Sequence, residues 1–379
     1  MNSHVHGSIE SIPAAAWNAL AGTTAPCLRH EYFAALEASG SIGSGSGWTP
    51  RYLTLETDAG GLRAAVPLYE KSDSRGEFIF DWDWAAALER SGRHYYPKLV
   101  AAIPFTPVPG PRILLAADAG INEARTLADA ALELAGERNA SSLHWLFVPE
   151  RELAPLEASG CLARTGCHFE WHNRGVDDFD AWLATLTSAR RKNIRRERRR
   201  VREAGIKCEW RDGGDLDADE LALVYRLYAA NYYVHGMMPY LGPQFFHELA
   251  RCMPESFAVC LAYRGAEIVA GAFYLQDAQT LYGRYWGAFE WIDCLHFEVC
   301  YYQGIAYAIE NRLKRFHPGV QGEQKLLRGF EPTTHYSAHW LRDTDLRRAV
   351  ASFLERERSA VSDYAEEAAE FLPFHRDKG

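Results

Sequence analysis

One stretch of this sequence can hold an anion. Nine of the thirteen residues from Arg190 to Arg202 are arginine or lysine, although the chain of 379 residues has a formal net charge of −9. The rest of the chain is therefore strongly acidic, and this stretch attracts anions locally. Guanidinium groups match phosphate oxygens bidentately, so we predict a phosphate-bearing ligand here. The residues expected to bind it are Arg190, Arg191, Lys192, Arg195, Arg196 and Arg199.

A second group of residues can transfer protons. His296 and Glu298, which we assign to catalysis, stand where a predicted strand is followed by a helix. Tyr302, which we assign to substrate binding, comes about one turn later. Histidine titrates near neutral pH, so His296 can shuttle a proton. Alternatively, His296 packs at the helix start and Glu298 complements the helix dipole. The pair also resembles the His-x-Glu of zinc deaminases, but the Pro-Cys-x-x-Cys of those enzymes is missing, and we predict no metal site.

Charged residues gather again in segment 321–329, which we predict to be a strand. Glu323 and Lys325 would share one side of it, with Arg328 out of phase. Buried strands seldom carry three charges without a purpose, which favours a role in the site. The alternative is an edge strand whose charges prevent aggregation. His335 follows and is a further candidate for polar contact with a substrate.

The first half of the chain contains alternating acids and indoles. On a strand, Asp81 and Asp83 would face one side, and Trp82 and Trp84 the other. Paired carboxylates can bind an amine, or one of them can act as a general base. The alternative is a half-exposed strand with its tryptophans inward.

Three more residues complete the candidate set. Arg112 ends a proline-rich loop, 104–112, that can wall a cleft, and its guanidinium can hold an anion, although turn formation alone explains the prolines. Arg284 and Tyr285 lie on the strand of the second half that matches the one carrying Asp81. We assign Arg284 to substrate binding and Tyr285 to catalysis, with core or pocket wall as the alternative for the tyrosine.

Two similar stretches must position these groups. Segments 52–84 and 257–287, roughly 200 residues apart, each predict three antiparallel strands joined by tight turns. A helix and another strand follow each of them. We therefore predict an α+β chain of two tandem lobes, each a mixed, mostly antiparallel sheet flanked by helices, at residues 1–165 and 166–379. A closing helix is expected at 343–371.

The cationic stretch itself predicts a helix at 188–204. Leu186, Ile194 and Val201 recur at three- and four-residue multiples, Asp178 can cap the start, and Gly205 is placed to end it. In an alternative interpretation, the helix is only a solvated surface on which acids of the chain pair with these arginines. Such exposed ion pairs contribute little to stability.

Composition indicates a soluble globular protein. With 47% hydrophobic and 24% charged residues, the chain can bury a large core in two domains. We find no apolar run long enough for a membrane span and no signal peptide, so we expect a cytoplasmic protein. The eight cysteines include no Cys-x-x-Cys, which argues against a disulfide framework or zinc knuckle.

Several strings of residues resemble those of the Fem-type predicted N-acyltransferases, and the resemblance covers nearly the whole chain. The strings are Phe80–Trp82, Tyr95–Lys98, Pro104–Pro107, His172–Gly175, Arg191–Glu197, Tyr282–Trp286, Leu295–Glu298 and Gly322–Lys325. That family belongs to the GNAT superfamily, and its relatives carry two GNAT-like lobes. Some of them transfer amino acids from aminoacyl-tRNA to the peptide of a cell-wall precursor. The resemblance thus implies a transferase that forms amide bonds.

The acyl donor stays open between aminoacyl-tRNA and acyl-CoA. The Gln/Arg-x-x-Gly-x-Gly/Ala loop of acyl-CoA-binding GNAT proteins is missing at 287–298, where no glycine series exposes amides to a pyrophosphate. We expect acyl or aminoacyl transfer to the amine of a small molecule or peptide, with no tightly bound cofactor. Acyl-CoA-dependent N-acetylation is an alternative. A non-catalytic RNA- or anion-binding protein is another, but it leaves the charged residues near 296 and 325 without a purpose.

Overall fold

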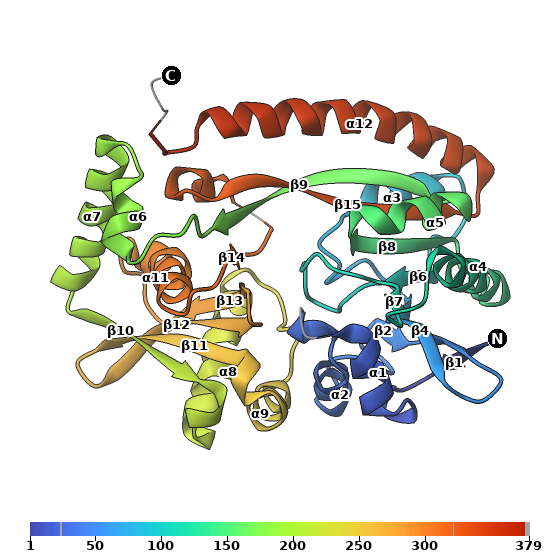
Figure 1. Cartoon of the computed structure of the whole chain (residues 1–379), viewed down its shortest axis with the longest axis horizontal. Coiled ribbons are helices and arrows are strands. Elements are labelled where there is room, and N and C mark those ends of the chain that lie inside the picture. Colours follow the sequence, from blue (N-terminus) through green and yellow to red (C-terminus); the bar gives the residue numbers. More distant parts are fainter. Residues whose placement is uncertain (23–24, 321, 376–379) are drawn as a thin grey trace. The chain divides into compact units, whose positions relative to one another are not determined.

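The computed structural model describes residues 1–22, 25–320 and 322–375, which group into two compact units. Unit 1 consists of Met1–Cys167 and Thr334–Asp363, and unit 2 of His168–Thr333 and the described residues from Tyr364 onward. The chain passes between the units within β9 (Leu162–His172), β15 (Glu331–Leu341) and α12 (Thr344–Glu370) (Figure 1). The predicted boundary therefore misplaces 334–363. Their membership of unit 1 comes from long-range pairing, such as Leu341 with Ser142, which no local pattern reveals.

Unit 1 contains a four-stranded sheet in the order β1-β3-β4-β7 and a second set of strands in the order β15-β8-β6-β5-β2, in which β6 and β8 are parallel. Its strands are β1 (Asn2–His6), β2 (Trp48–Pro50), β3 (Tyr52–Glu56), β4 (Leu62–Val66), β5 (Leu68–Lys71), β6 (Lys98–Ala101), β7 (Leu114–Leu115) and β8 (Ser142–Val148). Its helices include α1 (Ala14–Ala21), α2 (His30–Ala38), α3 (Trp82–Arg90), α4 (Ile121–Glu137) and α5 (Leu153–Ala158).

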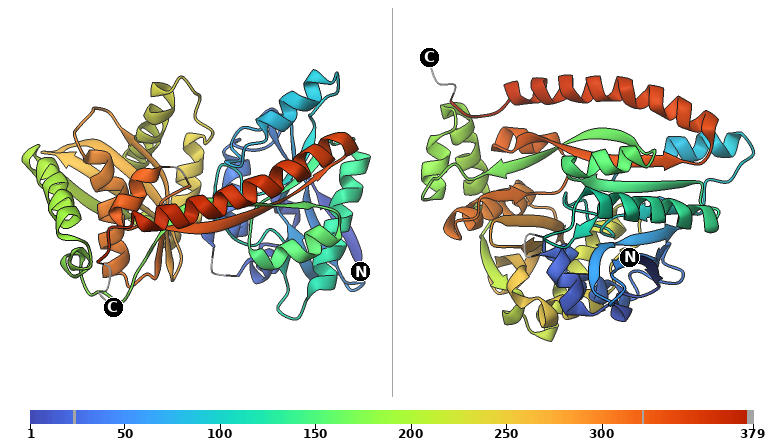
Figure 2. Two further views of the ribbon diagram at one scale, coloured as in Figure 1. Left: turned by 90° about the horizontal axis from the view of Figure 1, so that it is seen from above. Right: turned by 45° about the vertical axis from the view of Figure 1, so that its right-hand side comes forward.

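Unit 2 contains strands in the order β10-β11-β12-β13-β14-β9, with β13 and β14 parallel. Its strands are β10 (Ile206–Asp212), β11 (Phe257–Arg264), β12 (Glu267–Gln276), β13 (Thr280–Ala288) and β14 (Arg315–His317). Its helices include α6 (Phe179–Ala184), α7 (Ser188–Glu203), α8 (Ala218–Val234), α9 (Pro243–Cys252), α10 (Leu295–Phe297), the π-helix η6 (Glu298–Tyr302), α11 (Gln303–Glu310) and the 3₁₀ helix η7 (Glu323–Arg328). Figures 1 and 2 show α7 beside the segment from α10 to α11.

The predicted meander of the second half is confirmed, and that of the first half is only partly right. Strands β11, β12 and β13 pair antiparallel in succession. In the first half, β3 and β4 pair, but the third predicted strand, 77–84, is a loop followed by α3. The alternation of acids and indoles was misleading, because Trp84, Ala85 and Leu88 bury one face of a helix.

The strand predicted at 321–329 is also wrong, although Gln321 lies outside the described residues. Gly322 and Gly329, at φ of 103° and 80°, let the chain turn tightly into and out of η7. A 3₁₀ helix repeats every three residues, so Lys325 and Arg328 lie on one buried side. Glu323, which was expected beside Lys325, is exposed.

The predicted basic helix is confirmed within one residue of each end, and so is the closing helix. Ile194 and Val201 are buried, and Gly205 follows the last turn at a φ of 76°. Asp178 caps α6 instead, a separate short helix in which its side chain accepts from the Ala181 N–H. No described helix combines the length and apolar composition needed to span a bilayer.

Gly287 fixes how closely α8 packs on β13. A Cβ atom at this position would lie 1.7 Å from the Leu227 carbonyl oxygen, which is backbone and cannot rotate away. We therefore expect Gly287→Ala to lower the free energy of unfolding by at least about 3 kcal/mol, as overpacking at a rigid contact does. Chemical denaturation measures this loss.

Gly136→Ala is the matched control, since this helical glycine has open space around its Cβ position. It should leave stability unchanged or raise it by up to about 1 kcal/mol. If the two variants have the same denaturation midpoint, α8 can move away from β13 with little loss of stability.

Candidate functional site

Three segments that the sequence singled out meet around one cavity in unit 2. The cavity has a volume of about 360 Å³ and lies among α7, the α10–η6 corner and η7. Its lining residues are Asn193, Ile194, Glu197, Phe297, Tyr302, Gln324, Leu327 and Arg328. Of the predicted site residues, Tyr302 and Arg328 face it directly. We call it the α7 cavity.

A buried ion pair forms one wall of the α7 cavity. The Arg328 guanidinium donates to the Glu197 carboxylate at 3.0 and 3.2 Å and to the Tyr302 hydroxyl at 2.9 Å. The Tyr302 hydroxyl in turn donates to Glu197, and the Asn193 amide donates to the same carboxylate at 2.8 Å. The pair therefore joins α7, η6 and η7 through groups that have lost water.

Sequence reasoning missed Glu197. It is the one acid in the cationic stretch, and it lies three residues after Ile194 and four before Val201. That spacing places it on the buried face of α7, where a charge requires a partner. An acid on the apolar stripe of an arginine-rich helix was the available signal.

A second acid secures α7 from outside the cavity. Glu298 is buried and accepts from Arg198 at 3.0 to 3.2 Å and from the Gln303 amide at 2.8 Å. The Arg198 guanidinium also lies 4.4 Å from the centre of the Phe179 ring. Glu298, the first residue of η6, thus fixes the position of α7 through its ion pair with Arg198.

Two titratable groups near this wall are neutral near physiological pH. Burial lowers the pKa of Lys325 to about 7, and its Nζ donates to the Gly319 carbonyl at 2.7 Å. Burial, with Arg328 and Lys325 nearby, lowers the pKa of His296 to about 4. The His296 ring lies 4.9 Å from that of Trp286 and 5.3 Å from that of Tyr301. At pH 7.5 much of Lys325 is therefore neutral and can accept a proton, whereas the low pKa of His296 makes this ring neutral but a poor proton acceptor.

Most cations of α7 remain at the surface. Lys192, Arg195, Arg196, Arg199, Arg200 and Arg202 are exposed, and Arg190 and Arg191 are partly so. Acids do approach some of them, with Arg195 3.2 Å from Asp180 and Arg199 3.6 Å from Glu203. These acids are themselves 80% and 67% exposed, so such pairs hold the arginines weakly. Arg191 instead donates to carbonyls at the end of α6.

Arg284 and Tyr285 do not line the α7 cavity. Tyr285 stacks on Phe273, with 5.8 Å between ring centroids, and meets Tyr228 edge-on at 4.8 Å. It belongs to the wall of a small cavity of about 10 Å³ beneath α8. The Arg284 guanidinium lies 5.2 Å from the Tyr285 ring. The structure therefore supports the wall alternative for Tyr285.

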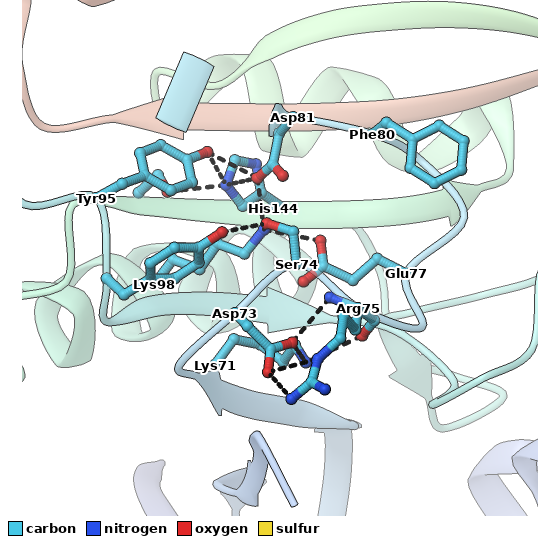
Figure 3. Close-up of polar contacts among 12 residues, drawn as sticks. Lys71, Asp73, Ser74, Arg75, Glu77, Phe80, Asp81, Tyr95, Lys98 and His144 are labelled. Carbon is cyan, nitrogen blue, oxygen red and sulfur yellow. Dashed lines mark hydrogen bonds and ion pairs between the residues drawn. The ribbon is translucent and has the colours of Figure 1, made fainter. Parts of the chain in front are cut away.

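In unit 1, Asp81 belongs to a buried network rather than to a carboxylate pair with Asp83. Figure 3 shows the Lys98 ammonium among Asp81 at 2.5 Å, Ser74 at 2.7 Å and Glu77 at 2.8 Å. Asp83 is exposed on the first turn of α3. Two positions along a helix turn the side chains apart, which is why the predicted pair does not form.

The charges of this network perturb each other. Burial raises the pKa of Glu77 to about 7. Burial would also raise the pKa of Asp81, but Lys98 and His144 bring it below its ordinary value. Burial tends to lower the pKa of Lys98, whereas Glu77 and Asp81 raise it above that of a free lysine. Lys98 is therefore a permanent cation that holds two acids.

Hydrogen bonds continue from Asp81 into the sheet. The Tyr95 hydroxyl donates to Asp81 at 2.7 Å and lies 3.1 Å from His144 Nε2, and His144 Nδ1 lies 2.8 Å from His339 Nδ1. Burial lowers the pKa of His144 to about 3 and that of His339 well below its usual range. Both rings are therefore neutral. These hydrogen bonds orient the Asp81 carboxylate without adding charge to the network.

Three other predicted residues lie apart from both clusters. Arg112 is fully buried and donates to the carbonyls of Val108 and Gly110 at 2.7 and 2.9 Å, so it braces the proline-rich loop. The His335 ring packs 5.0 Å from that of Phe147. Trp82 is 55% exposed, and its ring lies 4.6 Å from that of Phe80, which points away from Lys98 in Figure 3. Among the described residues, no group of histidine, cysteine and acid side chains could hold a metal ion.

Comparison with known proteins agrees with this architecture. A family model for FemAB-like proteins, described as peptidoglycan biosynthesis/recognition, matches residues 8–376. The crystal structure of FemX is similar, with a TM-score of 0.54 and 12% identity over 93% of this chain and 100% of FemX. L-PGS from Bacillus licheniformis has a TM-score of 0.50 and 10% identity over 85% of this chain and 95% of its own. A search of curated proteins found no match.

A third similar structure is the C-terminal domain of a putative lysylphosphatidylglycerol synthetase from Agrobacterium fabrum. Its TM-score is 0.50, with 10% identity over 81% of this chain and 88% of that domain. At such identities the likeness concerns the fold alone. The predicted α+β class, with two lobes built on mixed sheets, is confirmed.

The lysine network generates a stability prediction. Lys98→Met leaves Glu77 and Asp81 buried without their cation, and we expect a loss of about 3–5 kcal/mol at pH 7.5. The loss should shrink at pH 5, because protonation of the two acids removes their unpaired charge. Chemical denaturation at the two pH values measures both effects.

Lys71→Met is the matched control on the neighbouring strand, since Lys71 pairs directly across from Lys98 in the β5–β6 register. Burial lowers the pKa of Lys71 to about 8, and its partner Asp73 is also held by Arg75. This variant should cost about 1 kcal/mol or less, as a volume-conserving change does. Equal losses would contradict a special role for Lys98.

Proposed function

Because the chain belongs to the FemAB-like family of GNAT-fold acyltransferases, we propose that it transfers an acyl or aminoacyl group to the amine of a small molecule or peptide. The α7 cavity is the proposed donor site. The observation that carries the proposal is the meeting of the basic helix and a buried arginine around one cavity, with the neutral Lys325 on the same short helix as that arginine. The family description supports a peptide of the cell wall or its precursor as the acceptor.

The proposed reaction needs no covalent nucleophile. The neutral acceptor amine attacks the acyl carbonyl carbon, the C–N bond forms, and the C–O bond to the donor breaks. Arg328 lines the cavity. Glu197 balances its charge, but the Arg328 Nη1, which reaches the Gln324 amide oxygen at only 3.5 Å, can turn to donate to the oxyanion of the tetrahedral intermediate. Neutral Lys325 accepts the proton that the amine loses, and its ammonium returns a proton to the leaving oxygen.

Aminoacyl-tRNA is the preferred donor in this proposal, and acyl-CoA is the alternative. The exposed cations of α7 extend over several turns, which suits a polyanion better than a single pyrophosphate. The segment 289–294 between β13 and α10 carries no glycine, so it lacks the amide cradle expected of an acyl-CoA loop. Binding measurements with charged tRNA, uncharged tRNA and acetyl-CoA separate the two donors. Binding of acetyl-CoA alone would favour the alternative.

Charge reversal on α7 tests the donor surface. Arg195→Glu with Arg199→Glu should weaken binding of charged tRNA and reduce the magnitude of the slope of log K against log salt by about 1.4 to 1.8, because each of the two lost phosphate contacts contributes about 0.7–0.9. Filter binding at several salt concentrations measures the slope.

Arg251→Glu with Arg348→Glu is the control, because both arginines are strongly exposed and lie on other helices. An unchanged slope for the α7 variant would return the helix to the interpretation of a solvated surface. A slope reduced equally by both pairs would show only the effect of net charge.

Lys325→Met tests the proton acceptor. We expect kcat to fall about 10²–10⁴-fold, and the rise of activity as pH increases through about 7 to disappear, because the amine is active only when neutral. Lys207→Met, at an exposed lysine of β10, should leave the profile unchanged. A wild-type profile in the Lys325 variant would remove this residue from the mechanism.

Stability gives an independent check on the same lysine. Its folded pKa is below its unfolded value of 10.5, so the unfolded state binds more protons between pH 7 and 10.5. The wild type should therefore gain stability as pH rises through that window, and Lys325→Met should lack this gain. If Lys325→Met is stably folded at pH 7 but has low activity, the loss of activity comes from the missing proton acceptor and not from unfolding.

A further inference from the structure

We propose that the segment 289–294 of unit 2 is a stacking platform for unpaired bases of an RNA whose phosphates lie on α7. The proposal rests on the donor surface proposed above. The arginines of α7 contact only phosphates, and the segment 289–294 contacts the bases of the same RNA. Trp291 and Phe289 supply the aromatic faces. Their side chains are 86% and 49% exposed.

The segment holds these rings outward on a fixed backbone. The Phe289 N–H donates to the Val269 carbonyl at 2.9 Å, and the Leu295 N–H donates to the Ile292 carbonyl at 3.2 Å. Ile292 packs against the core of unit 2. Trp291 is therefore exposed between anchored neighbours, so that binding a base there orders little additional chain.

Two ion pairs connect the segment to basic elements on either side. Glu290 lies 2.8 Å from Arg264 of β11, and Asp293 lies 2.7 Å from Arg200 of α7. The two arginines offset the charge of the acids near Trp291, which reduces their repulsion of a phosphate backbone beside the indole. The contact with Arg200 also places the segment next to the cationic helix.

An RNA single strand suits this combination better than a protein or a lipid surface. Exposed cations contact phosphates, and each aromatic face can stack on a base of any sequence. A duplex hides its base faces, so the partner is an unpaired segment such as a single-stranded end. A membrane would use the indole without requiring bases, and the experiment below separates the two.

The experiment compares the full-length protein and its variants on three probes: a 12-nucleotide single-stranded RNA, inorganic polyphosphate, and phosphatidylglycerol vesicles. We expect Trp291→Ala to weaken RNA binding about 5- to 100-fold with an unchanged salt slope, because stacking is lost and phosphate contacts are kept. Binding of polyphosphate, which has no bases, should not change. Trp291→Phe should recover most of the RNA affinity.

Trp82→Ala is the matched control, since Trp82 is an exposed indole of unit 1. RNA affinity that is unaffected by Trp291→Ala, or lowered equally by Trp82→Ala, would overturn the proposal. Equal losses on polyphosphate and RNA would also overturn it, and so would a Trp291 effect confined to vesicles. The donor surface is judged separately, because its failure appears in the Arg195 and Arg199 variant and not in Trp291→Ala.

Discussion

The arrangement of the α7 cavity depends on the buried ion pair between Glu197 and Arg328. These residues are 131 positions apart, and their contact, shared with Tyr302, connects the basic helix to the two segments that complete the cavity. Removing either charge would leave the other buried and unpaired, which costs far more than an exposed pair contributes. The pair therefore specifies position: it fixes Arg328 of η7 at the cavity wall, whereas most arginines of α7 face solvent. The Phe297 ring, 3.5 Å from the Arg328 guanidinium, closes the same wall.

Unit 1 uses the same physical device with the charges exchanged. Lys98 is a buried cation between Glu77 and Asp81, and it holds the loop between β5 and α3. Asp81 stands at the N-cap position of α3 but makes no side-chain cap bond, and its Oδ2 accepts from Lys98 instead. In both units a local rule of helix or strand chemistry gives way to the need to pair a charge that has lost water.

The difference between local sequence patterns and long-range charge pairing explains which predictions were right. Periodicity defined α7, α12 and the β11–β13 meander, since a long amphipathic or alternating pattern has one low-energy solution. It failed at 77–84 and 321–329, two short segments that mix charged and apolar residues. Their conformation depends on partners elsewhere: Lys98 in the first case, Tyr302 and Glu197 in the second. Arg112 shows the same limit, because nothing local indicates that its donors are used by carbonyls of its own loop.

By itself, the sequence determined that the chain has a cationic helix, an α+β architecture and the motifs of a Fem-type acyltransferase. Each of these depends on residue types and spacing over short distances. The tertiary structure decided which charged residues meet. It selected Glu197 as the partner of Arg328, brought Lys325 next to the same wall and separated Asp81 from Asp83. The physical reason is that a buried charge is stabilised by whichever group long-range packing brings within a hydrogen-bond distance, and sequence spacing does not encode that distance.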